Sequence, residues 1–214
     1  IANDAAKNIF RKRASETSEK EEKEFTNVDI KSIEVENARS LGPEYVCNSV
    51  WNELKLNDFF LENGVKKESL PNIEALVVTR LVSGVSENHM NAYANNNSAI
   101  YELTGEPQAK SLSSFYRAAD TIFSLKDKLE QYLTDTERKL FSLNEKYYLF
   151  DLTNTYFEGE CKNNSKAQYG HSKEKRSDCK LVTLGLVVDE MGFAKASKLY
   201  SGNMNENKTL ETTI

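Results

Sequence analysis

The stretch YYLFDLTNTYFEG, residues 147–159, decides how the rest of the chain is interpreted. Its first seven residues are aromatic, aliphatic or β-branched except for Asp151, which predicts a strand buried on both faces. The apolar run LVTLGLVV at 181–188 predicts a second buried strand. The sequence DEMG at 189–192 predicts a hairpin turn in which Gly192 has a positive φ, and residues 193–200 predict a third strand. The hairpin turn predicts that 181–188 pairs with 194–200.

Residues 41–143, upstream of this stretch, have a helical pattern. All three prolines lie there, at positions 43, 71 and 107, each before apolar residues at helical spacing. Residues 86–103 predict two short helices with a break at 95–97. The sequence TDTE at 134–137 matches a capping box and predicts the start of another helix that buries Leu140 and Phe141. Such short helices suit a DNA-binding bundle, but they suit any other all-α bundle equally well.

The N-terminal residues differ from the rest of the chain. Residues 1–24 are charged throughout and predict a solvated helix, and residues 31–36 alternate between polar and apolar as a half-exposed strand does. The first residues lack both an initiator Met and the apolar segment of a signal peptide. Because the last residues also stop within a predicted helix, we expect the 214 residues to be a fragment.

Composition excludes several classes of protein. The 28 basic and 33 acidic residues give a net charge of −5, so any contact with nucleic acid must come from a local basic patch. Nine Gly and three Pro are too few to favour a β-sandwich, whereas ten Phe and ten Tyr can build a core. Three cysteines are an odd number and indicate a reducing compartment. Because no apolar run approaches the ~20 residues of a membrane helix, we expect a cytoplasmic protein without a membrane partner.

Asp151 is the main candidate for a functional residue. An ionised carboxylate in an otherwise apolar strand is costly unless it is paired, hydrogen-bonded or bound to a metal. The residue pattern leaves two interpretations open. Asp151 is either a metal ligand or an Asp at the end of a strand that accepts hydrogen bonds from the following loop.

The segment 160–180 is the local basic patch. It has six basic and three acidic residues, a net charge of 6 − 3 = +3, and its basic residues are Lys162, Lys166, Lys173, Lys175, Arg176 and Lys180. The segment therefore either holds a DNA backbone or is a solvated surface loop. The same segment contains Cys161, His171 and Cys179, but their spacing lacks the close ligand pairs of a zinc module.

Four short motifs follow one another in an order that resembles the DDE insertion-sequence transposases of bacteria. They are DLTNTYFEG at 151–159, GHSKEKRSD at 170–178, GLVVDEMG at 185–192 and GN at 202–203. Residues 40–62 and 114–129 are also similar to that family, although less specifically. The chain departs from the family pattern at Ser177 and Ser201, where Pro is common, and at Cys179, where an aliphatic residue is usual.

The resemblance implies an α+β fold and a function. A mainly α-helical region, residues 1–144, would bind DNA or form a homodimer. Residues 145–214 would be the first three antiparallel strands of a truncated RNase H-like core, in which 147–153 pairs with 181–188 only. Asp151 would be the first catalytic carboxylate and a ligand of two Mg²⁺ or Mn²⁺ ions. The second Asp and the Glu are expected beyond Ile214, so this fragment should lack the activity.

The complete enzyme would cut DNA at the terminal inverted repeats of its element and join these ends to target DNA. The resemblance also favours phosphate contacts by Lys173, Lys175 and Arg176. Three alternatives remain open. The chain could be a non-catalytic repressor that occupies element ends, an inert pseudogene product, or an RNase H-type nuclease unrelated to transposition.

Overall fold

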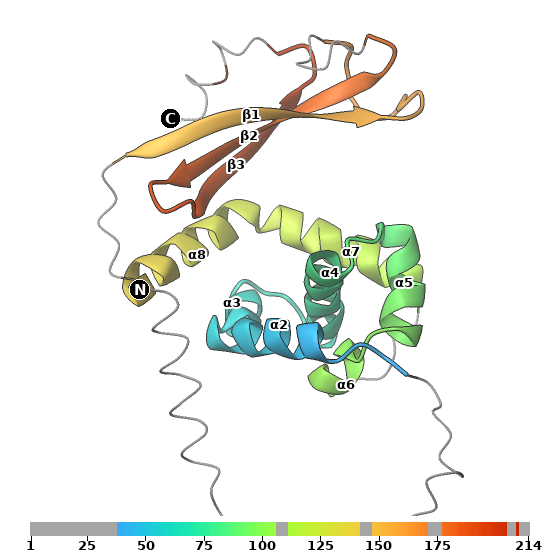
Figure 1. Ribbon diagram of the computed structural model, residues 1–214, viewed down its shortest axis with the longest axis vertical. Helices are drawn as coiled ribbons and strands as arrows, with labels where there is room; N and C mark the ends of the chain where they lie inside the picture. Colours follow the sequence, from blue (N-terminus) through green and yellow to red (C-terminus); the bar gives the residue numbers. More distant parts are fainter. Residues whose placement is uncertain (1–37, 106–110, 142–146, 171–176, 205–208, 210–214) are drawn as a thin grey trace, which may run out of the picture. The chain divides into compact units, whose positions relative to one another are not determined.

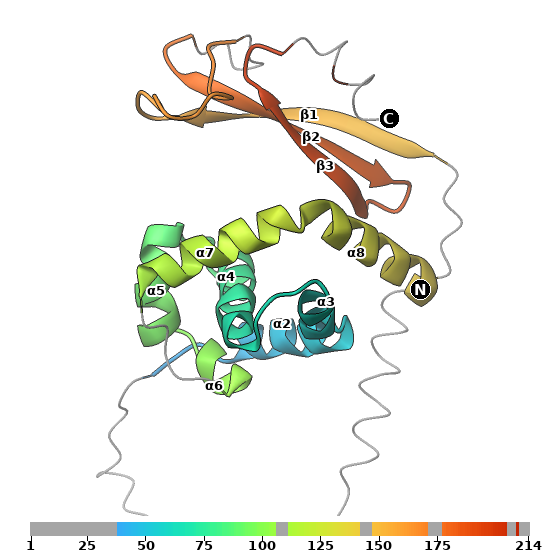
Figure 2. The same ribbon diagram turned by 180° about the vertical axis from the view of Figure 1, so that it is seen from behind.

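A computed structural model of the 214-residue chain describes residues 38–105, 111–141, 147–170, 177–204 and 209. These residues belong to one compact unit, Ala38–Ile214. They form seven α-helices, one short 3-10 helix and a three-stranded antiparallel sheet, so the predicted α+β class is confirmed (Figures 1 and 2). The elements expected at 1–24, at 31–36 and after residue 205 lie outside the described residues.

The helices follow the proline pattern of the sequence. Pro43 lies in the first turn of α2 and Pro71 in the first turn of α4, positions where proline costs no backbone hydrogen bond. The break predicted at 95–97 lies at 97–99, because α5 continues through Asn96 and α6 begins at Ile100. The helices are α2 (Gly42–Glu53), α3 (Leu56–Glu62), η2 (Lys67–Ser69), α4 (Leu70–Val82), α5 (Glu87–Asn96), α6 (Ile100–Thr104), α7 (Leu112–Ser124) and α8 (Lys126–Phe141).

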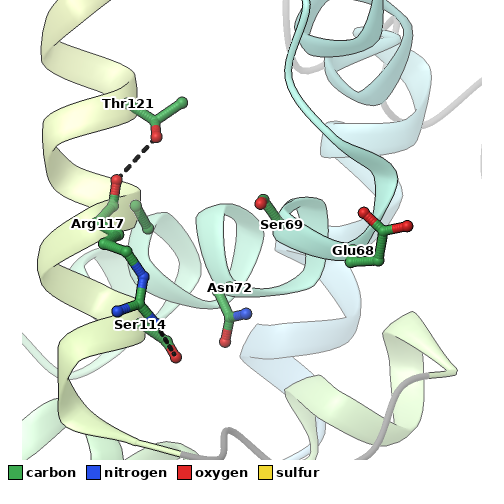
Figure 3. Close-up of a pocket in the computed structure, with 7 residues that line it drawn as sticks. Glu68, Ser69, Asn72, Ser114, Arg117 and Thr121 are labelled. Atoms are coloured by element: carbon green, nitrogen blue, oxygen red, sulfur yellow. Dashed lines mark hydrogen bonds between the residues drawn. The ribbon is translucent and has the colours of Figure 1, made fainter.

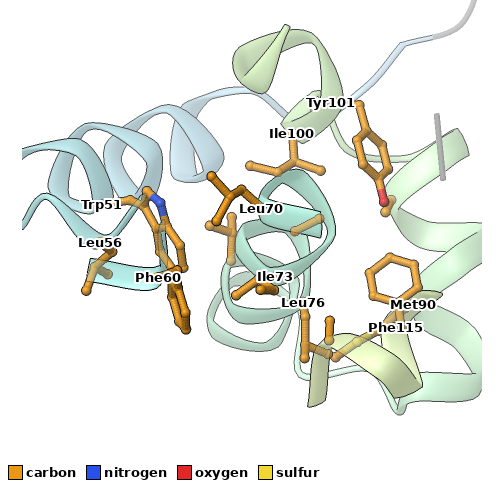
Figure 4. Packing of buried hydrophobic residues seen from close by; sticks show 14 of the residues in the cluster. Trp51, Leu56, Phe60, Leu70, Ile73, Leu76, Met90, Ile100, Tyr101 and Phe115 are labelled. Carbon is orange, nitrogen blue, oxygen red and sulfur yellow. The ribbon is translucent and has the colours of Figure 1, made fainter. Parts of the chain in front are cut away.

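The hydrophobic core of the helical part surrounds α4, which contacts α2, α5, α6 and α7. Ile73 of α4 is fully buried, and so are Met90, Ile100 and Phe115 from the helices around it (Figure 4). At one end of this core the rings of Trp51 and Phe60 stack with their centroids 6.0 Å apart. Burial of these large side chains is the main stabilising contribution to the helical part.

The helix expected to begin at residues 134–137 does not begin there. Thr134 lies inside α8, which starts after the single residue Leu125 and runs to Phe141. No Gly or Pro interrupts residues 125–141, so the helical ladder continues through the apparent capping box. The burial expected for Leu140 and Phe141 is also wrong, because these side chains are 63% and 53% exposed.

The sheet has the predicted order and pairing. Its strands are β1 (Tyr148–Phe157), β2 (Lys180–Asp189) and β3 (Ala194–Ser201), with β2 in the middle. In the turn between β2 and β3, Gly192 has a φ of 87°, as expected. Gly185 in β2 lies beneath two aromatic rings, since a Cβ there would lie 2.8 Å from the ring of Phe150 and 3.0 Å from that of Tyr200.

The prediction that the first strand is buried on both faces is wrong. In β1 the side chains of Phe150 and Leu152 are half-buried, whereas those of Leu149, Asp151 and Thr153 on the other face are exposed. The reason is the position of α8, which packs against β3, the strand farthest from β1. Among the described helices, none is both long and apolar enough to cross a membrane.

Candidate functional site

Asp151 lies in the middle of β1, with its side chain on the exposed face. It is the fourth of ten residues in the strand, which excludes the interpretation of an Asp at a strand end. In the register of the sheet, Asp151 is opposite Leu186 of β2, and Leu186 is opposite Ser197 of β3. Because directly paired residues point to the same face, these three side chains form one row across the sheet. A carboxylate in this position is held by a rigid strand and is exposed.

Glu130 of α8 provides another carboxylate on this face of the sheet. Its Oε1 accepts hydrogen bonds from the backbone N–H and the hydroxyl of Ser197, at 3.0 and 2.6 Å. Ser197 lies two strands away from Asp151, a backbone separation of about 10 Å at the usual strand spacing. That separation is too large for one Mg²⁺ ion, whose ligands lie at about 2.0–2.1 Å. The described residues contain no group of three His, Cys, Asp or Glu side chains that could hold a metal.

Asp189 is more than a turn residue, because it is 1% exposed at the end of β2. Its Oδ1 accepts hydrogen bonds from the backbone N–H groups of Met191 and Phe193, each at 2.9 Å, and its Oδ2 lies 3.1 Å from Lys195 Nζ. Burial by itself raises the pKa of Asp189, but the hydrogen bonds and the charge of Lys195 outweigh it and lower the pKa below its ordinary value. The carboxylate is therefore ionised and holds the hairpin together.

Lys195 also links the hairpin to α8. Its Nζ lies 2.9 Å from Glu137 Oε2, and its side chain is only 7% exposed. Glu130 and Glu137 are seven residues apart, so both lie on the side of α8 that faces β3. Sequence reasoning missed this cluster, although the i, i+7 spacing of the two glutamates was a signal for a second contact face on the helix.

The structure describes only part of the basic segment 160–180. Lys162 and Lys166 are exposed and Lys180 is half-buried, whereas Lys173, Lys175 and Arg176 lie outside the described residues. The ammonium of Lys162 is 2.5 Å from a carboxylate oxygen of Glu160, and that of Lys166 donates to the backbone oxygen of Leu199 at 2.9 Å. Lys166 therefore has a structural contact with β3 in addition to any role in binding.

Two glycines of the sequence motifs meet in space. Gly170 and Gly202 approach so closely that a Cβ on Gly170 would lie 1.9 Å from the carbonyl oxygen of Gly202. The contact is fixed by a two-way backbone bridge between Gln168 and Leu181 and by the N–H of Gly202, which donates to Lys166 at 3.1 Å. It lies beside the pair Thr155–Val182, about 13 Å along β1 from Asp151. The structure thus places the described part of the basic segment at one end of the sheet and Asp151 nearer the other.

The three cysteines are not in disulfides. Cys161 and Cys179 lie at the two ends of the basic segment, and Cys179 Sγ is 3.2 Å from Asp178 Oδ2. His171, which lies between these two cysteines in the spacing that was compared with zinc modules, is outside the described residues.

No protein-family model matches the chain, and neither a similar curated protein nor a similar solved structure was found. The functional interpretation therefore depends on the chain's own residues and on the order of its motifs.

Proposed function

We propose that this chain is part of a DDE transposase, in which Asp151 supplies one carboxylate of the catalytic metal site. The observation that carries the proposal is the place of Asp151, which is exposed in the middle of the first strand of an antiparallel β1-β2-β3 sheet. In the proposal these strands are the first three of an RNase H-like core. The order of the motifs at 151–159, 170–178, 185–192 and 202–203 supports it.

The chemistry explains why an exposed carboxylate on a rigid strand suits this role. A divalent pair of Mg²⁺ or Mn²⁺ ions activates the attacking oxygen and stabilises the leaving oxygen when a phosphodiester is cut. Asp151 would contribute hard oxygen ligands, and β1 would hold them in a fixed direction. One carboxylate cannot position two ions. In this proposal the remaining Asp and Glu come from residues that follow Ile214 in the complete protein.

The partners in this proposal are the terminal inverted repeats of an element, target DNA and a second copy of the full protein, in the cytoplasm of a bacterium. The helical part would contribute to binding at the element ends. The basic segment would contact the DNA backbone, where charge from Lys and Arg adds affinity without reading the base sequence.

A cleavage assay on the full product of the gene tests the catalytic role. The substrate is a duplex that carries the inverted repeats flanking the gene, incubated with Mn²⁺. Asp151→Asn should reduce cleavage at least a thousandfold with little change in DNA binding, because it removes a metal ligand and leaves the surface intact. Asp127→Asn is the matched control, since the side chain of Asp127 in α8 is 96% exposed, and it should cut normally. Normal cleavage by Asp151→Asn would contradict the proposal, and specific binding without cleavage by the wild type would favour the repressor alternative.

A salt titration of the 214-residue chain tests the role of the basic segment. Each phosphate that a protein neutralises adds about 0.9 to the magnitude of the log–log slope of affinity against salt. Replacing Lys173, Lys175 and Arg176 together by Gln should therefore flatten the slope by as much as ~3. A slope equal to that of the wild type would identify the segment as solvated surface.

A further inference from the structure

A polar pocket of about 340 Å³ lies between α7 and the start of α4, outside the four motifs between residues 151 and 203. Its volume is at the lower end of the range of about 300–1,000 Å³ typical of small-molecule sites. The lining is almost entirely polar, with Ala118 as its single apolar residue among those described, and the polar side chains come from both helices and from η2 (Figure 3). They are Glu68, Ser69, Asn72, Ser114, Arg117 and Thr121.

Arg117 is the cation of this pocket. Its two terminal nitrogens donate to the hydroxyls of Ser113 and Ser114, at 3.1 and 3.3 Å. No carboxylate of the described residues lies within ion-pair distance of it. An arginine has five N–H donors in a planar fork, so these two bonds leave donors for a ligand. Arg80 on α4 is different, because its guanidinium is paired with Glu87 at 2.5 Å.

Asn72 is held so that its amide hydrogens are available to a ligand. The phenol of Tyr101 donates to Asn72 Oδ1 at 3.2 Å and is itself 4% exposed. Burial raises the pKa of Tyr101 far above the neutral range, so the phenol keeps its proton and remains the donor. With Oδ1 engaged in this way, the NH₂ group of Asn72 remains free to donate at the floor of the pocket, where Figure 3 shows it on the side away from Arg117 and toward Glu68.

We propose that this pocket binds a phosphate group, with Arg117 as the cationic ligand and the amide of Asn72 and the pocket hydroxyls as further donors. Arginine recognises phosphate through two parallel charge-assisted hydrogen bonds, which fits a guanidinium with no carboxylate partner in the described residues. The polar lining disfavours an apolar ligand, and it contains no aromatic ring on which a base could stack. The phosphate belongs either to a DNA backbone or to a small phosphate ester. The inference goes beyond the transposase proposal, because it depends on the pocket alone.

A change at Glu68 should have the opposite effect on phosphate binding from a change at Arg117. Its carboxylate lies across the pocket from Arg117 (Figure 3). A negative charge at the rim repels a bound anion. Removing it should therefore tighten phosphate binding, whereas removing the charge of Arg117 should weaken it.

The experiment is a titration of the 214-residue chain with inorganic phosphate at constant ionic strength, followed by the NMR signals of the Asn72 side-chain amide and the Arg117 Nε–H. Saturable shifts are expected in the wild type. Arg117→Gln should weaken binding at least tenfold, as expected for the loss of charge-assisted bonds worth about 1.5–3 kcal/mol. Glu68→Gln should strengthen binding about two- to fivefold. The matched control Arg80→Gln, which removes an arginine already paired with a carboxylate, should bind as the wild type does.

Two further measurements complete the test. Asn72→Ala removes a donor without a change in charge and should also weaken binding, so the proposal remains testable if Arg117→Gln does not fold. Shifts that are absent in the wild type, or equal in the wild type and Arg117→Gln, would overturn the proposal.

Binding of a 20-base-pair duplex then identifies the source of the phosphate. A salt slope lowered by about 0.9 in Arg117→Gln indicates a DNA backbone, and an unchanged slope alongside phosphate binding indicates a small phosphate ester.

Discussion

Glu74 shows how one residue makes the stability of the helical part depend on pH. Its side chain in α4 is 3% exposed, and one carboxylate oxygen accepts a hydrogen bond from Asn48 Nδ2 at 2.6 Å. Burial raises the pKa of Glu74 above its ordinary value of 4.5, and the hydrogen bond from Asn48 only partly opposes this. The folded state therefore holds this proton more tightly than the unfolded state does, and stability falls as the pH rises from about 4.5 through the raised pKa.

Replacing Glu74 by Gln should consequently stabilise the protein at pH 7. The amide oxygen of Gln can still accept the hydrogen bond from Asn48, while the cost of burying a charge disappears. The expected gain in the free energy of unfolding is on the order of 1 kcal/mol at pH 7 and close to zero at pH 4. Urea unfolding at both pH values measures it, with Glu62→Gln at the exposed end of α3 as the control. An equal effect at the two pH values would contradict the assignment.

The close contact between Gly170 and Gly202 depends on the absence of a Cβ atom at both positions. A Cβ at Gly202 would lie 2.1 Å from the carbonyl oxygen of Leu181 and 2.6 Å from that of Gln168, and backbone atoms cannot rotate away as a side chain can. Gly202→Ala should therefore break the three backbone hydrogen bonds that join residues 166–168 to the sheet, at a cost of roughly 2–3 kcal/mol. Gly42→Ala has no neighbouring atom within 4 Å and should be neutral or slightly stabilising. Comparison of the two variants by urea unfolding checks the prediction, and equal stability would refute it.

At the scale of elements, α8 joins the sheet through a nearly buried cation. Lys195 lies between Glu137 and Asp189, and the exposed fractions of the three side chains are 7%, 19% and 1%. Removing one partner of a buried ion pair leaves an uncompensated charge, which usually costs about 3–5 kcal/mol. Lys195→Met should lower the protection of β3 amides against hydrogen exchange by about this free energy.

A set of variants separates the charge effect from packing. Lys198→Met, in the same strand but exposed, is the matched control and should change protection by less than about 0.5 kcal/mol. The triple change of Lys195→Met, Asp189→Asn and Glu137→Gln should recover most of the loss, because no unpaired charge remains. If the triple variant is as unstable as Lys195→Met, the ion cluster is not the cause.

The same elements show how far the sequence predicts the fold. The apolar runs at 147–153 and 181–188 and the turn at Gly192 predicted the three strands, because these signals are local, and the pairing of the first two strands was predicted from the resemblance to an RNase H-like core. The burial of β1 could not be predicted in the same way, since it depends on which strand α8 covers. The capping-box pattern at 134–137 failed because a continuous helix stabilised by contacts on two sides outweighs a local start signal.

The candidate sites differ in the same way, because a local pattern can predict a contiguous motif but not a contact between distant residues. Asp151 could be predicted as a candidate because its motif is contiguous. The cluster of Glu137, Asp189 and Lys195 joins residues up to 58 positions apart. The pocket brings Asn72 to Arg117 from separate helices. No local pattern contains such pairings, and only the packing of the helices and the sheet creates them.

At the scale of the whole molecule, α8 connects the helical core to the sheet. On one side of the helix, the phenol of Tyr132 donates to the backbone oxygen of Leu54 at 2.8 Å, and its ring lies 4.9 Å from that of Phe59. On the other side, Glu130 and Glu137 bind β3. A helix held on both sides should make the helical core and the sheet unfold together.

This coupling can be measured because the chain has a single tryptophan. Trp51 lies in the helical core, so its fluorescence reports on the helices, whereas the amides of β2 report on the sheet. In the wild type both probes should give the same free energy of unfolding. In Lys195→Met the contacts of Tyr132 remain and still couple the two parts, so the Trp51 transition and the β2 amides should lose about the same free energy of unfolding. A Trp51 transition that stays in place while the β2 amides lose protection would contradict this coupling, because it would show that the helical core unfolds independently of the sheet.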